Sequence, residues 1–204
     1  MEKVIKLFSA LFLVVVVTIG CTASYNVKTV ADEFSDPNSA LITKMMTDNF
    51  INSYADPLKL VPASQLNAYV MVNKNTNKVE ELGLFLINVR HSGGMMRVSN
   101  SWLNIREGDE MIILTDTKRI VLYAKRPRID SRTSYNSVTR SIDTDYFDYA
   151  FYPIQKDDFK ALATSQTFKL KVQGQNGVDV YKDQINAGLL PNFLKFYQEE
   201  IEGK

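Results

Sequence analysis

Short apolar segments separated by turn-forming residues at even intervals constrain the fold of this chain more than any other feature. From Gln65 onward, apolar residues alternate with polar or aromatic ones, as in Leu66, Ala68, Val70 and Val72. This period of two residues is typical of half-buried strands. The intervening turns are Asn73–Lys78, His91–Gly94, Arg106–Asp109 and Thr115–Lys118. Strands at this spacing predict an antiparallel sandwich or barrel.

The N-terminal part of the pattern allows two interpretations. The segment Asp36–Ser39 reads Asp-Pro-Asn-Ser, which favours a type I turn. A hairpin between Val27–Phe34 and Leu41–Thr47 is the preferred interpretation. The alternative is a helix beginning at Pro37, because apolar residues between Ile42 and Phe50 also fit a helical stripe.

The middle of the chain contains strands of different character. The near-continuous apolar run within Val79–Val89 predicts a central strand covered on both faces. Met95–Val98 and Ser101–Ile105 are expected to be extended. Met111–Leu114 and Ile120–Ala124 are expected to be further strands. The polar segment Lys125–Ser141 is expected to be a long loop with some extended pairing.

The last third combines strands with two short helices. Phe147, Tyr149 and Phe151 alternate along one expected strand and are assigned to the core, which leaves Tyr146 and Tyr152 facing outward or packing under a helix. Beyond them, a short helix is expected near Asp157–Ala163, a strand at Thr167–Val172, a tight turn at Gly174–Gly177 and a C-terminal helix at Pro191–Ile201. The fold class is therefore mainly β or α+β, an antiparallel β-sandwich-like domain with two short helices, one C-terminal.

The N-terminal segment has the layout of an export signal. Lys3 and Lys6 form a basic start, and Leu7–Ile19 is apolar apart from one serine and one threonine. Thirteen residues are short for a membrane-spanning helix, which needs about twenty. The segment ends in Gly20-Cys21, and Cys21 is the single cysteine of the chain.

The end of this segment resembles the bacterial lipobox, in which the cysteine receives a diacylglyceryl group and cleavage occurs just before it. Gly20 and Cys21 match the motif, whereas Thr18 replaces the usual aliphatic residue. The resemblance implies a lipid attachment at Cys21 and a location at the cell envelope. No aspartate follows the cysteine, which in Gram-negative lipoproteins implies the outer rather than the inner membrane. The expected organisation is a signal peptide at 1–20, a lipidated tether at 21–26 and one β-rich domain at 27–204.

Composition narrows the classes of function. Loss of the leader takes the basic residues from 24 to 22 and the acidic residues from 23 to 22, so the mature chain is formally neutral. A neutral chain has no global field to steer nucleic acid. No phosphate-binding loop, cysteine nucleophile or metal-ligand spacing is present in the sequence, so no cofactor, metal or catalytic residue is assigned.

Three further groups of residues resemble sites, but each has a simpler structural interpretation. His91, the only histidine, is expected to be an ordinary loop residue rather than a general base. Met95 and Met96 would point to opposite faces of a strand, which is unfavourable for a shared copper ion. The acidic residues Asp143, Asp145 and Asp148 lack the glycine and glutamate of a calcium loop and are expected to form a solvated turn.

The segment Lys118–Arg140 is the one strongly charged stretch. It contains seven basic residues and a single acidic one, Asp130. Five of the seven are arginine, which suits bidentate contacts with carboxylates or phosphates. Arg126, Arg128 and Arg132 are the candidate residues for an anionic or protein partner.

Together these features predict a lipid-anchored envelope protein that acts as a non-catalytic binding or assembly module. Its expected partners are the membrane, reached through the lipid anchor, and an envelope protein, anionic glycan or anionic lipid. One alternative is an envelope hydrolase that uses His91 or paired carboxylates. Another is a structural subunit of an envelope complex that contacts its neighbours through a sheet edge.

Overall fold

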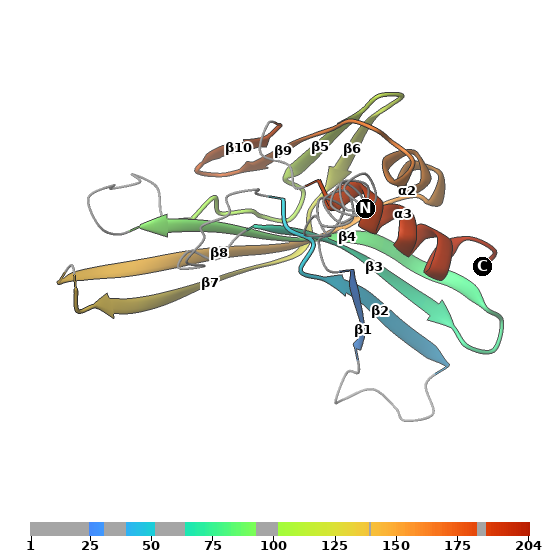
Figure 1. The fold of residues 1–204 in the computed structure, drawn as a ribbon, viewed down its shortest axis with the longest axis horizontal. Coiled ribbons are helices and arrows are strands. Elements are labelled where there is room, and N and C mark those ends of the chain that lie inside the picture. The colour runs from blue at the N-terminus through green and yellow to red at the C-terminus, as the bar shows by residue number, and fades with distance from the viewer. Residues whose placement is uncertain (1–24, 31–39, 52–63, 93–101, 139, 183–186) are drawn as a thin grey trace, which may run out of the picture.

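The computed structural model describes residues 25–30, 40–51, 64–92, 102–138, 140–182 and 187–204. This part of the chain forms two antiparallel sheets and two helices, one of them C-terminal (Figure 1). The predicted fold class is therefore confirmed. The leader, Cys21 with the three residues that follow it, and Met95–Val98 lie outside the described residues.

The larger sheet has six strands in the order β1-β2-β3-β4-β8-β7, and every neighbouring pair is antiparallel. Its strands are β1 (Asn26–Val30), β2 (Leu41–Thr47), β3 (Gln65–Asn73), β4 (Lys78–Ser92), β7 (Lys125–Asn136) and β8 (Ser141–Pro153). The antiparallel pairing of β1 with β2 confirms the predicted N-terminal hairpin and excludes the helix in this part.

The smaller sheet has four strands in the order β10-β9-β5-β6. Its strands are β5 (Glu110–Thr115), β6 (Arg119–Tyr123), β9 (Phe168–Gly174) and β10 (Gly177–Tyr181). The helices are α2 (Lys156–Ala163) and α3 (Leu189–Phe196), and a π-helical turn, η1 (Tyr197–Ile201), continues α3. Both expected helices are confirmed, and β10 is a strand that the sequence pattern did not single out.

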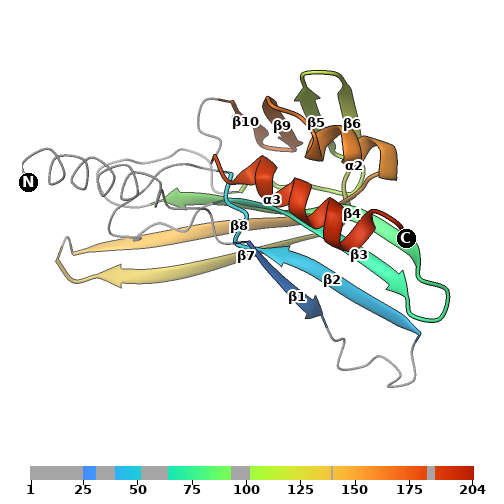
Figure 2. The same cartoon turned by 45° about the vertical axis from the view of Figure 1, so that its right-hand side comes forward.

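The smaller sheet and the helices lie on the same face of the larger sheet (Figures 1 and 2). We call this the inner face. Alternation along the strands places Leu66, Ala68 and Val70 of β3 on it, and all three are fully buried. Phe159 of α2 meets Phe193 of α3 edge to face at 5.8 Å, so the helices share one core with both sheets. Burial of this apolar surface is the main stabilising contribution.

Lys44 of β2 binds the η1 turn to the larger sheet. Its ammonium lies 2.6 Å from the carboxylate of Glu200. Asn192 of α3 donates a hydrogen bond to the side-chain carbonyl of Asn49, just after β2, at 3.1 Å. Because Asn49 and Asn192 are both buried, the bond satisfies polar groups that would otherwise be costly to enclose.

Two predictions about the middle of the chain are wrong. The expected loop at Lys125–Ser141 is instead mostly the twelve-residue strand β7, which pairs with β8 as far as its turn. Apart from Pro127, every residue of β7 whose burial is described is exposed, so this edge strand is polar on both faces. The described part of the expected strand Ser101–Ile105 is not in either sheet, because its backbone amides bond to a buried carboxylate on β8.

The predicted core face of β8 is correct for Phe151, which is buried, and wrong for Phe147 and Tyr149. Tyr152 is fully buried on the inner face, whereas Phe147 and Tyr149 lie half-buried on the opposite, outer face. Phe151 shares the outer face but is buried, because its ring lies over Gly83 of β4. The predicted strand β4 is central, as expected, but its outer residues Phe85 and Ile87 are only half-buried.

Candidate functional site

The strands β7 and β8 extend past the rest of the larger sheet and form a projecting ribbon (Figure 2). Register places Gln65, the first residue of β3, level with Tyr149 and Arg128. Residues Ile129–Asn136 and Ser141–Asp148 continue beyond that row, and we call them the arm. Eight residues of each strand span about 26 Å at about 3.3 Å per residue. β4 pairs with five of the eight β8 residues of the arm, and its last pair is Ser92 with Thr144, so only the end of the arm extends beyond β4.

The candidate arginines lie on β7, at the edge of the larger sheet. The Arg128 guanidinium lies 4.8 Å from the centre of the Tyr149 ring, and that of Arg126 lies 5.3 Å from the centre of the Phe151 ring. Arg126 also donates a hydrogen bond of 2.9 Å to Glu81 of β4. Cation–π contacts of this exposed kind contribute about 0.5–1 kcal/mol each. Arg126 and Arg128 therefore help to cover the outer aromatic face, while Arg132 is exposed on the arm.

The distal end of the arm exposes large apolar side chains. Tyr135, Val138 and Ile142 are 66%, 92% and 68% exposed. Tyr135 and Ile142 are partners in the β7–β8 register, so their side chains lie on the same face of the ribbon. We call these three residues the tip. They are the three most exposed large apolar residues in the described part of the chain.

Asp148 corrects the prediction of a solvated acidic turn. Its side chain is 1% exposed and lies on the inner face at the base of the arm. The two carboxylate oxygens accept hydrogen bonds from the backbone amides of Leu103, Asn104 and Ile105 at 2.9, 2.9 and 3.3 Å. Burial raises the pKa of this carboxyl above its usual value, and the three amide donors oppose that effect. Asp148 thus has a structural role, which is to hold segment 102–105 against β8.

A second polar cluster joins the two sheets. Arg90 of β4 makes a two-pronged contact with Asp179 of β10, with hydrogen bonds of 2.6 and 3.2 Å. Asn88 donates to the same carboxylate at 2.9 Å and accepts from the buried hydroxyl of Tyr181. Burial raises the pKa of Tyr181, which keeps its hydroxyl protonated and able to donate. These contacts fix the position of β10 and leave Asp179 engaged with Arg90.

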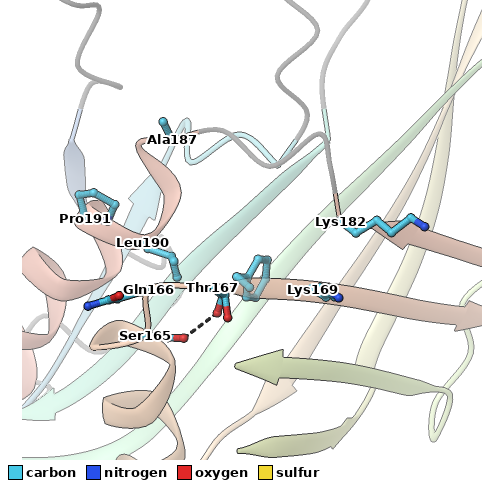
Figure 3. A pocket seen from close by; sticks show the side chains of 9 residues that line it. Ser165, Gln166, Thr167, Lys169, Lys182, Ala187, Leu190 and Pro191 are labelled. Carbon is cyan, nitrogen blue, oxygen red and sulfur yellow. Dashed lines mark hydrogen bonds between the residues drawn. The ribbon is translucent and has the colours of Figure 1, made fainter. Parts of the chain in front are cut away.

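An open depression of about 620 Å³ lies between the start of β9 and the start of α3. Figure 3 shows Leu190 and Pro191 on one side and Ser165 and Thr167 on the other, while Lys182 extends away from both. The Ser165 hydroxyl is within hydrogen-bonding distance of the Thr167 carbonyl oxygen, at 2.6 Å, and of the Asp116 carboxylate. The Ser165 hydroxyl is therefore already hydrogen-bonded within its own loop. Among the described residues of the depression, no set of free polar groups points to a common centre.

The remaining candidate residues are not brought together. His91 lies near the end of β4, opposite Asp145 in the register, rather than in the expected loop. Within the described ranges no group of three or more His, Cys, Asp or Glu residues is placed to hold a metal ion. The same ranges contain no helix long and apolar enough to span a membrane. Met95, Met96 and Cys21 lie outside these ranges.

The arm could not have been recognised from residue types alone. Its arginines form a visible charged segment, but the polar character of Lys125–Ser141 predicts a loop, whereas the segment is mostly strand β7. Val138 and Ile142 stand in a polar context that carried no signal of a shared surface. Comparison of the chain with protein-family models, curated proteins and solved structures found no match.

Proposed function

We propose that this chain is a lipid-anchored protein of the cell envelope that acts as a non-catalytic binding or assembly module. The observation that carries the proposal is strand β7 together with the arm: Lys125, Arg126 and Arg128 make the start of the strand basic, and the arm into which it continues ends in apolar side chains. Neither property is needed to bury the core. Exposed apolar side chains in this number are typical of contact surfaces.

The edge strand β7 is the binding element in this proposal. It pairs with β8 on one side and ends the order of the larger sheet, and the proposal places an added strand along its other edge, where the Asp130 carbonyl already accepts a hydrogen bond of 3.1 Å from the Trp102 indole. Its charged residues are Lys125, Arg126, Arg128, Asp130 and Arg132. Antiparallel pairing of two copies along this edge would bring like charges together, which is destabilising. The partner is therefore an acidic, extended segment of another envelope protein.

The edge is tested by reversing its charge while leaving the core untouched. The variant Arg128→Glu/Arg132→Glu changes two side chains that are exposed on β7. Its matched control, Lys169→Glu/Lys171→Glu, makes the same change of charge on exposed positions of β9. Each protein is cross-linked in its own membranes and purified, and captured proteins are identified by mass spectrometry. A thermal unfolding curve is recorded for each variant to check that it folds.

The expected result is loss of one acidic partner from the β7 variant and its retention by the β9 control. Equal capture by both variants would remove the β7 edge as a binding site. A photo-crosslinking residue at Arg132 should label an acidic stretch of the same partner, and a crosslinker at Lys171 should not.

The lipid anchor is tested separately at Cys21. The Cys21→Ser variant cannot receive the diacylglyceryl group, so it should appear in the soluble fraction after cell disruption. Mass spectrometry of the wild-type protein should show an acylated N-terminal peptide that begins at Cys21. An unmodified cysteine in the membrane-bound protein would contradict the anchor.

A further inference from the structure

The apolar side chains at the tip of the arm are not accounted for by a partner strand that pairs with β7. Tyr135 and Ile142 face the same side of the ribbon, and Val138 lies in the turn between the strands. An extended partner along β7 would pair with backbone, whereas these side chains project beyond the last support from β4. The tip therefore needs a different kind of partner.

Register places the tip and the start of β1 toward the same end of the larger sheet. Lys28, Met45, Tyr69, Gly83 and Pro153 form one row across five strands. Asn26 lies two residues from this row, in the direction of the arm, and is therefore level with Phe151. β1 thus begins on the side of the sheet to which the arm points.

The lengths of the two segments differ. Ser141, at the end of β8, lies ten residues beyond Phe151, or about 33 Å at about 3.3 Å per residue. Cys21 precedes Asn26 by five residues, which span at most about 17 Å. Because the arm is longer than the tether, an anchored domain that turns this end toward the bilayer brings the tip to the surface only with the arm tilted toward the membrane plane.

Charge near the tip indicates what kind of surface it meets. The segment from Arg132 to Asp145 contains two arginines, the second being Arg140, and two aspartates, the first being Asp143. Its formal net charge is therefore zero. A balanced segment gains little from an anionic surface, so apolar contact must supply the attraction. Tyrosine beside aliphatic residues is typical of side chains at the membrane–water interface.

We propose that Tyr135, Val138 and Ile142 insert into the interfacial region of the bilayer that carries the lipid anchor, and so fix the orientation of the domain on the membrane. This inference rests on the proposed anchoring at Cys21. The arm then lies close to the membrane surface, where its β7 edge meets a partner.

The tip can be followed with a fluorescent label, because Cys21 is the only cysteine of the chain and acylation blocks its thiol. The lipidated full-length product is purified with Val138→Cys, labelled with an environment-sensitive dye and reconstituted into vesicles of phosphatidylethanolamine and phosphatidylglycerol. The control carries the dye at Val180→Cys, a 57% exposed position on β10. Brominated acyl chains report contact between the dye and lipid.

A blue-shifted emission and quenching at Val138, with neither at Val180, is the expected result. Both signals should be lost from Val138→Cys when Tyr135→Ser and Ile142→Ser are added, and should persist when Val178→Ser is added instead. They should also change little with salt. Solvent-like emission at both positions in anchored protein overturns the inference and leaves the anchor intact. Quenching that depends on salt and on phosphatidylglycerol contradicts an apolar contact.

Failure of the anchor gives a different result. In that case mass spectrometry shows an unmodified Cys21, and the dye is directed to Val138 in a Cys21→Ser background. Vesicles are then added to the protein in solution. A blue shift at Val138 still supports the tip as a membrane contact, and its absence overturns it. A blue shift that depends on protein concentration without vesicles identifies a second copy as the partner and also overturns the inference.

Discussion

Replacement of Asp148 tests whether its carboxylate stabilises the fold by holding segment 102–105 against β8. In Asp148→Ala the amides of Leu103, Asn104 and Ile105 lose their acceptor. Leu103 and Ile105 are buried, so water cannot readily replace the carboxylate. A buried donor left without an acceptor costs about 1–3 kcal/mol, so two of them predict a loss of about 2–6 kcal/mol. Asp148→Asn keeps one carbonyl oxygen and should cost less.

The assay is urea unfolding followed by tryptophan fluorescence. Trp102 is the single tryptophan, it adjoins Leu103, and its ring meets that of Tyr146 edge to face at 4.7 Å. It therefore reports on the segment that Asp148 holds. The control is Asp130→Ala, whose exposed carboxylate accepts a hydrogen bond of 2.8 Å from the adjacent Ser131 amide. That change should stay within about 0.5 kcal/mol.

The same residue predicts a dependence of stability on pH. Because burial raises the native pKa of Asp148, the native state retains its proton at a pH where the unfolded state has lost it. The contribution of this group to stability therefore falls as pH rises from about 4, the unfolded value, through the native pKa. Asp148→Asn should remove this slope. If Asp148→Ala lowers the free energy of unfolding by less than about 0.5 kcal/mol, the structural role assigned to this carboxylate is wrong.

Two further changes test contacts elsewhere in the fold. In Gly83→Ala the new methyl group would lie 2.2 Å from the Phe151 ring and 2.9 Å from the Tyr152 carbonyl oxygen, so urea unfolding should show a loss of about 1–3 kcal/mol, and an unchanged midpoint would contradict this packing. Asp116 accepts hydrogen bonds from Ser165 and from the amides of Gln166 and Thr167, which lower its pKa, so its contribution to stability is present above about 4 and is lost as pH falls. Asp116→Asn should therefore lower the melting temperature at pH 7, and the difference from wild type should narrow in acid; a constant difference would exclude the mechanism.

Much of the local structure follows from the sequence. Alternation identified β3, turn residues placed the ends of β5 and β6, and the change of period near Asp157 located α2. These features depend on neighbours in the chain, since the period of apolar residues and the backbone preferences of turns are local properties. The resemblance of Gly20-Cys21 to a lipobox is also local, and it remains a prediction.

Tertiary structure decided the properties of the arm. β7 consists largely of polar residues with no apolar face, and it is a strand because β8 is long enough to pair with it. Phe147 and Tyr152 both suit a core position, and only the placement of the smaller sheet and helices decided that Tyr152 is buried. Asp148 likewise became a structural acceptor because segment 102–105 is brought to it from a distant part of the chain. Contacts between segments far apart in sequence leave no period in either segment, and for that reason the candidate site could be found only in the folded chain.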